Sequence, residues 1–162
     1  MAGFIKFDGI DGDSTDDKHS AWCDITSYSL GASSPGHMGG GGGGGGAGKV
    51  SLSDLVVTKY TDKASPKLFQ FCCEGKHVKK VTLEMTATYG DAGVLTYLKI
   101  ELEDAIITGY SMAGTGDHGS QPSETVTVGF SKIKQTYSPY DEKGKNPGDV
   151  PAGWDTLKNK ST

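Results

Sequence analysis

The stretch VTLEMTATYGDAGVLTYLKIELE, residues 81–103, decides the fold class. Apolar and polar residues alternate through 81–89, which is the period of a strand with one buried face. Residues 90–93 supply turn residues, and a strand pattern resumes through 94–103. The stretch therefore predicts a β-hairpin, which needs further strands to cover its apolar face.

Further strand patterns flank this hairpin. Alternation or Val- and Leu-rich runs predict strands at residues 4–10, 21–30, 50–60, 105–112 and 124–137. Within 21–30, the alternation places Ser27 and Ser29 on the face of Cys23 and Ile25. Within 124–137 the apolar spacing changes phase, which predicts a bulge near residues 131–132.

A single segment predicts a helix. Ser65 and Pro66 are typical of an N-cap and a first helical position, and Gly75 is placed to end the helix. Leu68, Phe69 and Cys72 recur at helical spacing, so one face of this short helix is expected to be buried.

Together these elements predict a single domain over residues 1–162. Its class is mainly β: a small antiparallel β-barrel with one flanking short α-helix. An extended Gly-rich loop is expected at 33–48. Residues 139–162 are expected to form a C-terminal tail that Trp154 and Leu157 anchor on the barrel.

The Gly-rich loop contains eight consecutive glycines, residues 39–46. Glycine has no side chain to pack and loses the most backbone entropy on ordering. The loop is therefore either a flexible spacer or a segment ordered against a neighbouring molecule. The sequence leaves both alternatives open.

Composition narrows the functional classes. The net charge is −4, and all sixteen basic residues are Lys. Because Arg is the preferred residue for bidentate phosphate and base contacts, nucleic acid is not expected as a partner. The first residues do not combine a basic start with a following apolar stretch, so any export is expected to occur without a classical signal peptide. No apolar run approaches the length of a membrane span, so membrane insertion is not expected. The three cysteines, Cys23, Cys72 and Cys73, are expected to be free thiols.

Motifs for chemistry are incomplete. Residues 43–49 match the first seven positions of a phosphate loop, but the eighth is Val50 and a strand pattern follows. The acidic run 11–17 lacks the Gly and Glu positions of a calcium loop and leaves at most a weak surface site. His19 with Cys23, and Cys73 with His77, have spacings too weak to predict zinc. No catalytic residue, metal site or cofactor is therefore predicted, and the protein is expected not to be an enzyme.

The chain resembles the haemolysin-coregulated protein (Hcp) family, the ring subunit of the bacterial type VI secretion system. The best motif is Lys-Tyr-x-Asp-Lys-x-Ser-Pro-x-Leu at residues 59–68. Other shared features extend over nearly the whole chain: Phe4-Ile5-Lys6, Gly12-Asp13-Ser14 leading to His19, Tyr28-Ser29, His37-Met38 before the glycines, 97–102, 126–137 and Gly153-Trp154.

The resemblance implies a homohexameric ring that stacks into a tube inside a contractile sheath. It implies expulsion from the bacterial cytoplasm, with sheath, spike and effector proteins as partners and effectors carried in the lumen. By resemblance Ser29 lies on the inner wall, so Ser27 and Ser29 are candidate cargo-facing residues; plain solvent exposure of both remains an alternative. The loop is expected to contact neighbouring subunits through the candidates His37, Met38, Gly39, Gly42, Gly46, Gly48 and Lys49.

Two other functions remain open at this point. The first is the tail-tube protein of a phage or of an extracellular contractile injection particle, which shares the barrel and the ring. The second is a stand-alone β-barrel binding module or enzyme, against which the incomplete motifs weigh. The motif at 59–68 favours the secretion subunit.

Overall fold

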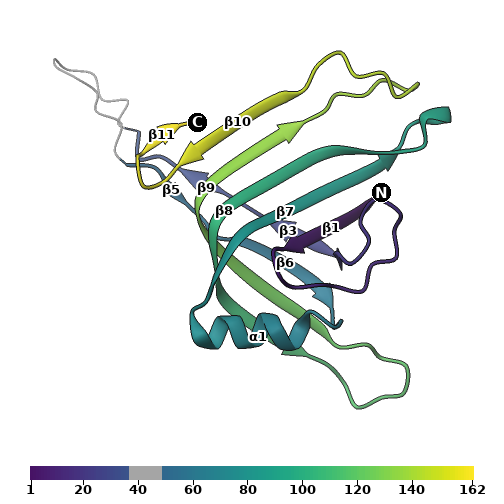
Figure 1. Ribbon diagram of the computed structural model, residues 1–162, viewed down its shortest axis with the longest axis vertical. Helices are drawn as coiled ribbons and strands as arrows, with labels where there is room; N and C mark the ends of the chain where they lie inside the picture. Colours follow the sequence, from purple (N-terminus) through teal and green to yellow (C-terminus); the bar gives the residue numbers. More distant parts are fainter. Residues whose placement is uncertain (37–48) are drawn as a thin grey trace.

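The computed structural model describes residues 1–36 and 49–162, and strands dominate it (Figure 1). The elements in chain order are β1 (Ala2–Phe7), β2 (Cys23–Ile25), β3 (Ser27–Ser29), β4 (Ala32–Ser33), β5 (Ser51–Leu52), β6 (Leu55–Tyr60), α1 (Ser65–Glu74), β7 (His77–Thr88), η1 (Gly90–Ala92), β8 (Val94–Ala113), β9 (Ser123–Tyr137), β10 (Val150–Asp155) and β11 (Lys160–Ser161).

The main sheet curls into a barrel, and every pair of strands in it is antiparallel. Its order is β11-β10-β9-β8-β7-β1-β2, while β6 pairs with both β9 and β3. The strand pairing does not run continuously around the barrel, because β2 pairs with β1 whereas β3, the next strand in the chain, pairs with β6. Among the described residues Thr26 joins the two sides, because its N–H donates to Thr58 O at 2.8 Å. The expected mainly β class with one short helix is confirmed.

The bend at Thr26 corrects the prediction of one strand over 21–30. Cys23 is buried in the core, whereas Ser27 and Ser29 are exposed and Tyr28 packs against the core. The inward face therefore changes phase at Thr26, and the two serines do not share a face with Cys23. The cause is the change of partner strand, which a single alternation pattern does not contain.

The long strand β8 corrects the expected break between 94–103 and 105–112. Asp104 adopts φ +51° inside the strand, and its carboxylate accepts a hydrogen bond from Ser131 Oγ at 2.9 Å. The alternation of buried and exposed residues changes phase there on both β8 and β9. On β8, the buried residues are Leu102 and then Ala105, three positions later. The β8–β9 register is kept at residues 131–132, so the predicted bulge is wrong; the register shifts between Ile107 and Gly109 instead.

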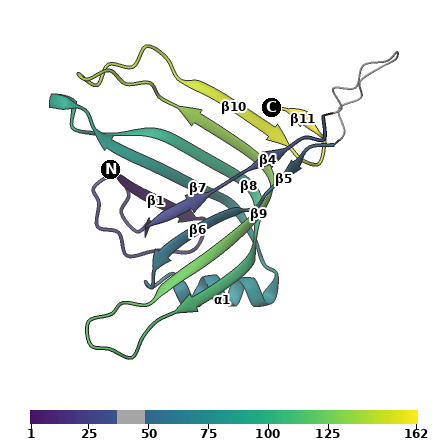
Figure 2. The same ribbon diagram turned by 180° about the vertical axis from the view of Figure 1, so that it is seen from behind.

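The helix α1 covers the end of the barrel at which β8 extends beyond its pairing with β7 (Figures 1 and 2). Ser65 is its first residue and Ala64 is its N-cap, while Ser65 Oγ accepts a hydrogen bond from Asp62 N at 3.0 Å. Leu68 is buried as expected, but the prediction for Phe69 is wrong, because this side chain is 56% exposed. Gly75 ends the helix at φ +61°, as predicted, because a left-handed residue there favours glycine.

The core fills the barrel and the underside of α1. Its buried apolar residues are Ile5, Phe7, Ile10, Cys23, Leu55, Val57, Ala64, Leu68, Val78, Val81, Leu83, Ile100, Leu102, Ala105, Ile107, Val126, Val128 and Ile133. Burial of each Leu or Ile side chain contributes about 1.5–3 kcal/mol before entropy is counted. The barrel interior is thus a packed core and leaves function to the outer surfaces.

Residues 139–162 are more ordered than a tail, because β10 pairs with β9 along its whole length. Trp154 packs against the core, as expected, whereas Leu157 is 78% exposed and anchors nothing. Gly153 lies where a side chain would meet Thr162 Oγ1, so glycine permits this close approach of the last residues.

Candidate assembly surface

One outer face of the barrel carries mostly hydroxyl and other small side chains on four adjacent strands, β3, β6, β9 and β8. The ladder sets Ser27 opposite Thr58, and Thr58 opposite Thr125, so these side chains lie in one row. In β3, β6, the first five residues of β9 and the last five of β8, the outward residues are Ser27, Ser29, Val56, Thr58, Tyr60, Ser123, Thr125, Thr127, Gly109, Ser111 and Ala113. None of them is charged. We call this surface the hydroxyl face.

Hydroxyl groups on this face bond one another. Thr26 Oγ1 lies 2.8 Å from Thr58 Oγ1 and 3.1 Å from Thr58 O, and Ser27 Oγ also bonds Thr58 Oγ1. A lone carboxylate, Asp54, borders the face and accepts a hydrogen bond from Thr108 Oγ1 at 2.7 Å. The face therefore presents short groups that donate and accept hydrogen bonds, without a fixed charge.

The structure places both predicted candidates, Ser27 and Ser29, on this exposed face. Prediction from sequence missed their neighbours on the other strands. The run Ser-Glu-Thr-Val-Thr-Val at 123–128 carried a signal, since hydroxyl residues occupy alternate positions there. The pairing of β9 with β6, which sets them beside β3, was not visible in the sequence.

Both borders of the hydroxyl face are open strand edges. In residues 1–36 and 49–162, β3 pairs only with β6. β8 pairs with β7 as far as Ile106, and from Ile107 to Ala113 it pairs only with β9. Open edges carry backbone groups ready to pair with another strand.

A two-stranded ribbon extends from the end of β3. Ala32 pairs with Leu52, Ser33 pairs with Ser51, and Ser53 Oγ bonds Gly31 N at 2.7 Å. Lys49 is exposed beside this ribbon. The other loop candidates, His37, Met38, Gly39, Gly42, Gly46 and Gly48, lie outside the described residues.

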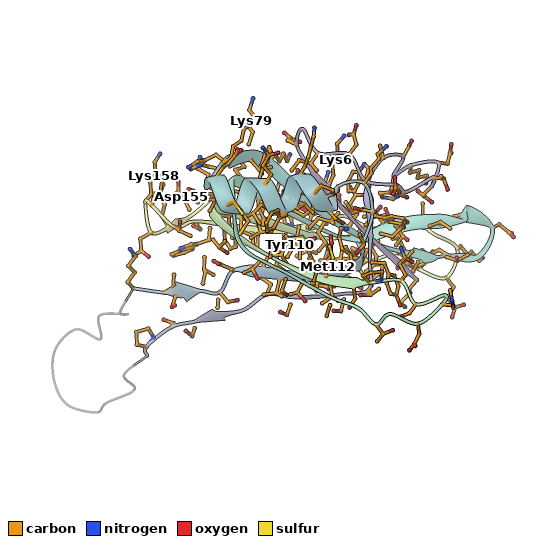
Figure 3. All side chains as sticks on the ribbon, turned by 90° about the horizontal axis from the view of Figure 1, so that it is seen from below. Lys6, Lys79, Tyr110, Met112, Asp155 and Lys158 are labelled. Carbon is orange, nitrogen blue, oxygen red and sulfur yellow. The ribbon has the colours of Figure 1, made fainter. Side chains whose placement is uncertain are left out.

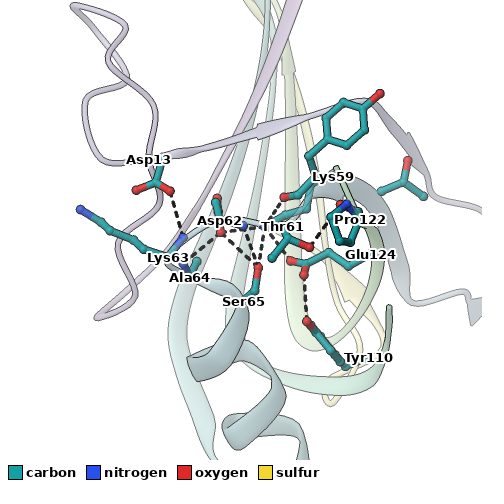
Figure 4. A network of polar contacts seen from close by, with 12 residues as sticks. Asp13, Lys59, Thr61, Asp62, Lys63, Ala64, Ser65, Tyr110, Pro122 and Glu124 are labelled. Atoms are coloured by element: carbon teal, nitrogen blue, oxygen red, sulfur yellow. Dashed lines mark hydrogen bonds and ion pairs between the residues drawn. The ribbon is translucent and has the colours of Figure 1, made fainter. Parts of the chain in front are cut away.

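The motif at 59–68 forms a buried polar network at the start of α1 (Figure 4). Lys59 Nζ lies 2.8 Å from Asp62 Oδ1 and 2.6 Å from Glu124 Oε1, and the Lys59 and Glu124 side chains are fully buried. Tyr110 donates to Glu124 Oε2 at 2.8 Å. The specific part of the motif therefore joins β6, β9, β8 and the helix, and it is structural.

The network shifts two pKa values. Burial lowers the pKa of Lys59, but the contacts with Asp62 and Glu124 outweigh burial, so the pKa lies above the ordinary 10.5. Burial, and then the hydrogen bond to Glu124, raise the pKa of Tyr110. Lysine therefore stays charged and tyrosine neutral at physiological pH, and both contacts hold.

The outer face of β7 and the adjoining half of β8 is charged instead. Lys80 Nζ lies 2.7 Å from Glu101 Oε1, and Lys99 Nζ lies 3.7 Å from both Glu84 and Glu101. Burial raises the pKa of Glu101, but the lysines outweigh it and hold the pKa below its ordinary value. The barrel thus has two outer faces of different chemistry.

The barrel is open toward β10, between the inner faces of β8, β9 and β10 and the end of β3. One groove here has a volume of about 380 Å³, and an adjacent groove of about 330 Å³ shares Leu30 and Gln135 with it. The two are lined by Tyr28, Ser29, Leu30, Gly31, Ala32, Leu52, Leu98, Ile100, Ile133, Gln135, Ala152, Gly153 and Trp154. We call this uncharged surface the barrel mouth. Trp154 Nε1 is buried there and has no hydrogen-bond partner among the described residues.

Two findings on the described part of the chain concern metal binding and membrane crossing. No group of three His, Cys, Asp or Glu residues there is arranged to hold a metal ion. His19 lies between Asp16 at 2.6 Å and Glu84 at 2.9 Å, away from Cys23. The three cysteines are free. Over the described ranges no helix has the length and apolar character that a membrane crossing needs.

Comparison with known proteins gives a consistent result. Residues 4–137 match the family described as type VI secretion system effector, Hcp. The chain is 37% identical to protein hcp1 of Pseudomonas aeruginosa over 157 residues, which cover 96% of this chain and 95% of the relative. Among solved structures, a type six secretion system protein superposes with a TM-score of 0.89 at 32% identity, covering 99% of both chains. Hcp1 from Salmonella typhimurium superposes with a TM-score of 0.79 at 36% identity, covering 99% of this chain and 98% of that one.

Proposed function

Because this chain belongs to the Hcp family and is a structural tube subunit of the type VI secretion system, we propose that six copies close into a ring. The rings stack into the inner tube, which is expelled with effectors in its lumen. The chain assembles into rings and carries effectors, and it performs no catalysis of its own.

The observation that supports this proposal is the hydroxyl face with its two open edges. Among the described residues, β3 has one free edge and β8 has one beyond Ile106, and two such edges can join head to tail with identical copies. Such heterologous contacts close into a ring when the rotation between copies is right. The hydroxyl faces then form one continuous inner wall.

The chemistry of this wall suits a general carrier. Ser27, Ser29 and the threonines beside them offer hydrogen bonds but no fixed charge. Diverse effectors therefore bind weakly and leave readily when the tube is expelled. We assign the cargo-facing role to Ser27 and Ser29 together with Thr58 and Thr125.

The remaining surfaces receive the other partners of the system. The charged face of β7 and β8 turns outward, toward the contractile sheath. The ribbon of β4 and β5 with Lys49 extends from the ring toward a neighbouring subunit, and a spike protein caps the tube. Loading takes place in the bacterial cytoplasm, and expulsion carries the ring out of the cell.

Native mass spectrometry and sedimentation of the purified chain test the ring. A species near six times the 16.9 kDa chain mass is expected at micromolar concentration. Electron microscopy of that species should show a closed ring with a central hole. A folded monomer at all concentrations would overturn the proposal.

A further inference from the structure

Four tyrosines gather where the tip of the β7–β8 hairpin meets the loop after β9. The rings of Tyr89 and Tyr140 have centroids 5.0 Å apart, and their planes are tilted by 52°. Burial raises the pKa of Tyr89, and the phenol groups of Tyr137, Tyr97 and Tyr140 add to this effect, which places all four near one another. Figures 1 and 2 show the two segments side by side, and the hairpin tip projects beyond α1 in Figure 3.

The backbone holds both segments in place. Ser138 N–H donates to Tyr97 O at 2.8 Å, so the loop after β9 is attached to β8 just before Tyr140. Gly144 lies so close to the hairpin tip that a side chain there would meet Ala92 Cβ, and its φ of +77° also favours glycine. The contact between the tyrosine rings is therefore fixed from both sides.

Two phenols in contact have a defined oxidative chemistry. A one-electron oxidant removes one electron and one proton from each hydroxyl group, and a carbon–carbon bond then forms between ring carbons ortho to the two oxygens. The hydrogens on these two carbons move to the oxygens as protons, which restores both phenols. Hydrogen peroxide takes up the two electrons and two protons that were removed and becomes two molecules of water. The product is dityrosine.

We propose that Tyr89 and Tyr140 form an oxidative cross-linking site, at which hydrogen peroxide and a one-electron catalyst such as a haem peroxidase join the two side chains. At 5.0 Å between centroids the ring carbons are within contact range, so coupling is effectively unimolecular. Both side chains are half-buried, which leaves part of each ring open to solvent. The site does not depend on the proposed ring.

The cross-link would tie the hairpin tip to the loop after β9. The chain's three cysteines all lie in described segments and are free, so no disulfide joins these two segments. The new bond closes a chain segment of about 50 residues, which restricts the unfolded chain and should raise the melting temperature by roughly 5–10 °C.

Exposure alone makes a different prediction. The tyrosines with the most exposed side chains are Tyr60, at 53%, and Tyr137, at 50%. If exposure decided the reaction, these two would couple first and would join different chains. Contact between the rings instead predicts a bond within one chain, between two half-buried tyrosines.

Peroxidase treatment of the purified chain tests the site. The experiment uses a Cys73→Ser background, so that the exposed thiol does not consume the oxidant. The product is expected to show dityrosine fluorescence, to lose the mass of two hydrogen atoms, and to run as a single chain on a denaturing gel. Trypsin, which cleaves after lysine, should release peptide 81–99 joined to peptide 135–143.

Phenylalanine variants identify the two residues, because each of these peptides contains two tyrosines. Tyr89→Phe and Tyr140→Phe should each lower the yield of the joined peptides at least about tenfold. Tyr97→Phe and Tyr137→Phe are the matched controls from the same peptides and should retain the product. Circular dichroism should show the same fold for all four variants.

Three outcomes would overturn the proposal. The first is the absence of joined peptides after treatment, and the second is their persistence in Tyr89→Phe or Tyr140→Phe. The third is a product that runs only as dimers and larger species on the denaturing gel, which would show that exposure decides the coupling. An unchanged melting temperature in the cross-linked chain would overturn the predicted stabilisation.

Discussion

Lys59 links the barrel to the start of the helix through Glu124, Asp62 and Ser65. Its ammonium group is buried with Glu124 at 2.6 Å. Lys59→Met leaves that carboxylate buried with the Tyr110 hydrogen bond but without a counter-ion, so we expect the free energy of unfolding to fall by about 3–5 kcal/mol. Urea denaturation measures it. The double variant Lys59→Met with Glu124→Leu should recover most of the loss, and equal loss in both would contradict the argument.

The same residue gives a pH dependence. The folded-state pKa of Lys59 is raised, so its contribution to stability is full below the ordinary lysine pKa of 10.5 and is lost as pH rises through the folded value. Unfolding midpoints measured from pH 8 to alkaline pH should therefore decline faster in the wild type than in Lys59→Met. Parallel curves would show that Lys59 is not responsible.

Ser29 tests the inner wall at the same scale. Its side chain is exposed on the hydroxyl face, so Ser29→Glu should leave the fold and the ring intact. The new charge should reduce co-purification and secretion of effectors several-fold. Loss of the ring would place Ser29 in a subunit contact, and unchanged cargo transport would remove it from the binding surface.

Among the elements, the ribbon of β4 and β5 makes its own prediction. It pairs at only two positions, and Ala32, Ser33 and Ser51 are exposed. Deletion of residues 39–46 should therefore change the melting temperature by less than about 2 °C. Tube formation followed by electron microscopy should weaken. Loss of neither property would support the spacer, and equal loss of both would make the loop part of the barrel.

The individual elements also show how much of the fold can be predicted from the sequence. The hairpin of β7 and β8 and the end of α1 at Gly75 follow from local pattern, because alternation and a left-handed glycine are local properties. The bend at Thr26 and the phase change at Asp104 depend on which strand lies opposite, so the pattern of one strand does not contain them. Lys59 illustrates the same limit, since a buried lysine is intelligible only once Glu124 faces it.

At the scale of the whole molecule, the two strand edges assigned to the ring contact, Ser27–Ser29 and residues 107–113, carry no charged side chain. Screening by salt acts on charges and leaves apolar contacts and backbone pairing largely intact. The midpoint concentration of ring formation should therefore change less than about threefold between about 0.05 M and about 0.5 M NaCl. Sedimentation at the two ionic strengths measures this, and a steep loss of rings in salt would move the contact to the charged face.

Trp154 in the barrel mouth has one more consequence, which is optical. The chain has two tryptophans. The Trp22 ring packs edge-on against the His19 ring, with 4.9 Å between the ring centroids, and Trp22 does not line the mouth. A group that binds in the barrel mouth changes the surroundings of the Trp154 indole and leaves Trp22 as an internal reference. The intrinsic emission spectrum thus provides a label-free signal by which occupancy of the mouth can be followed in real time.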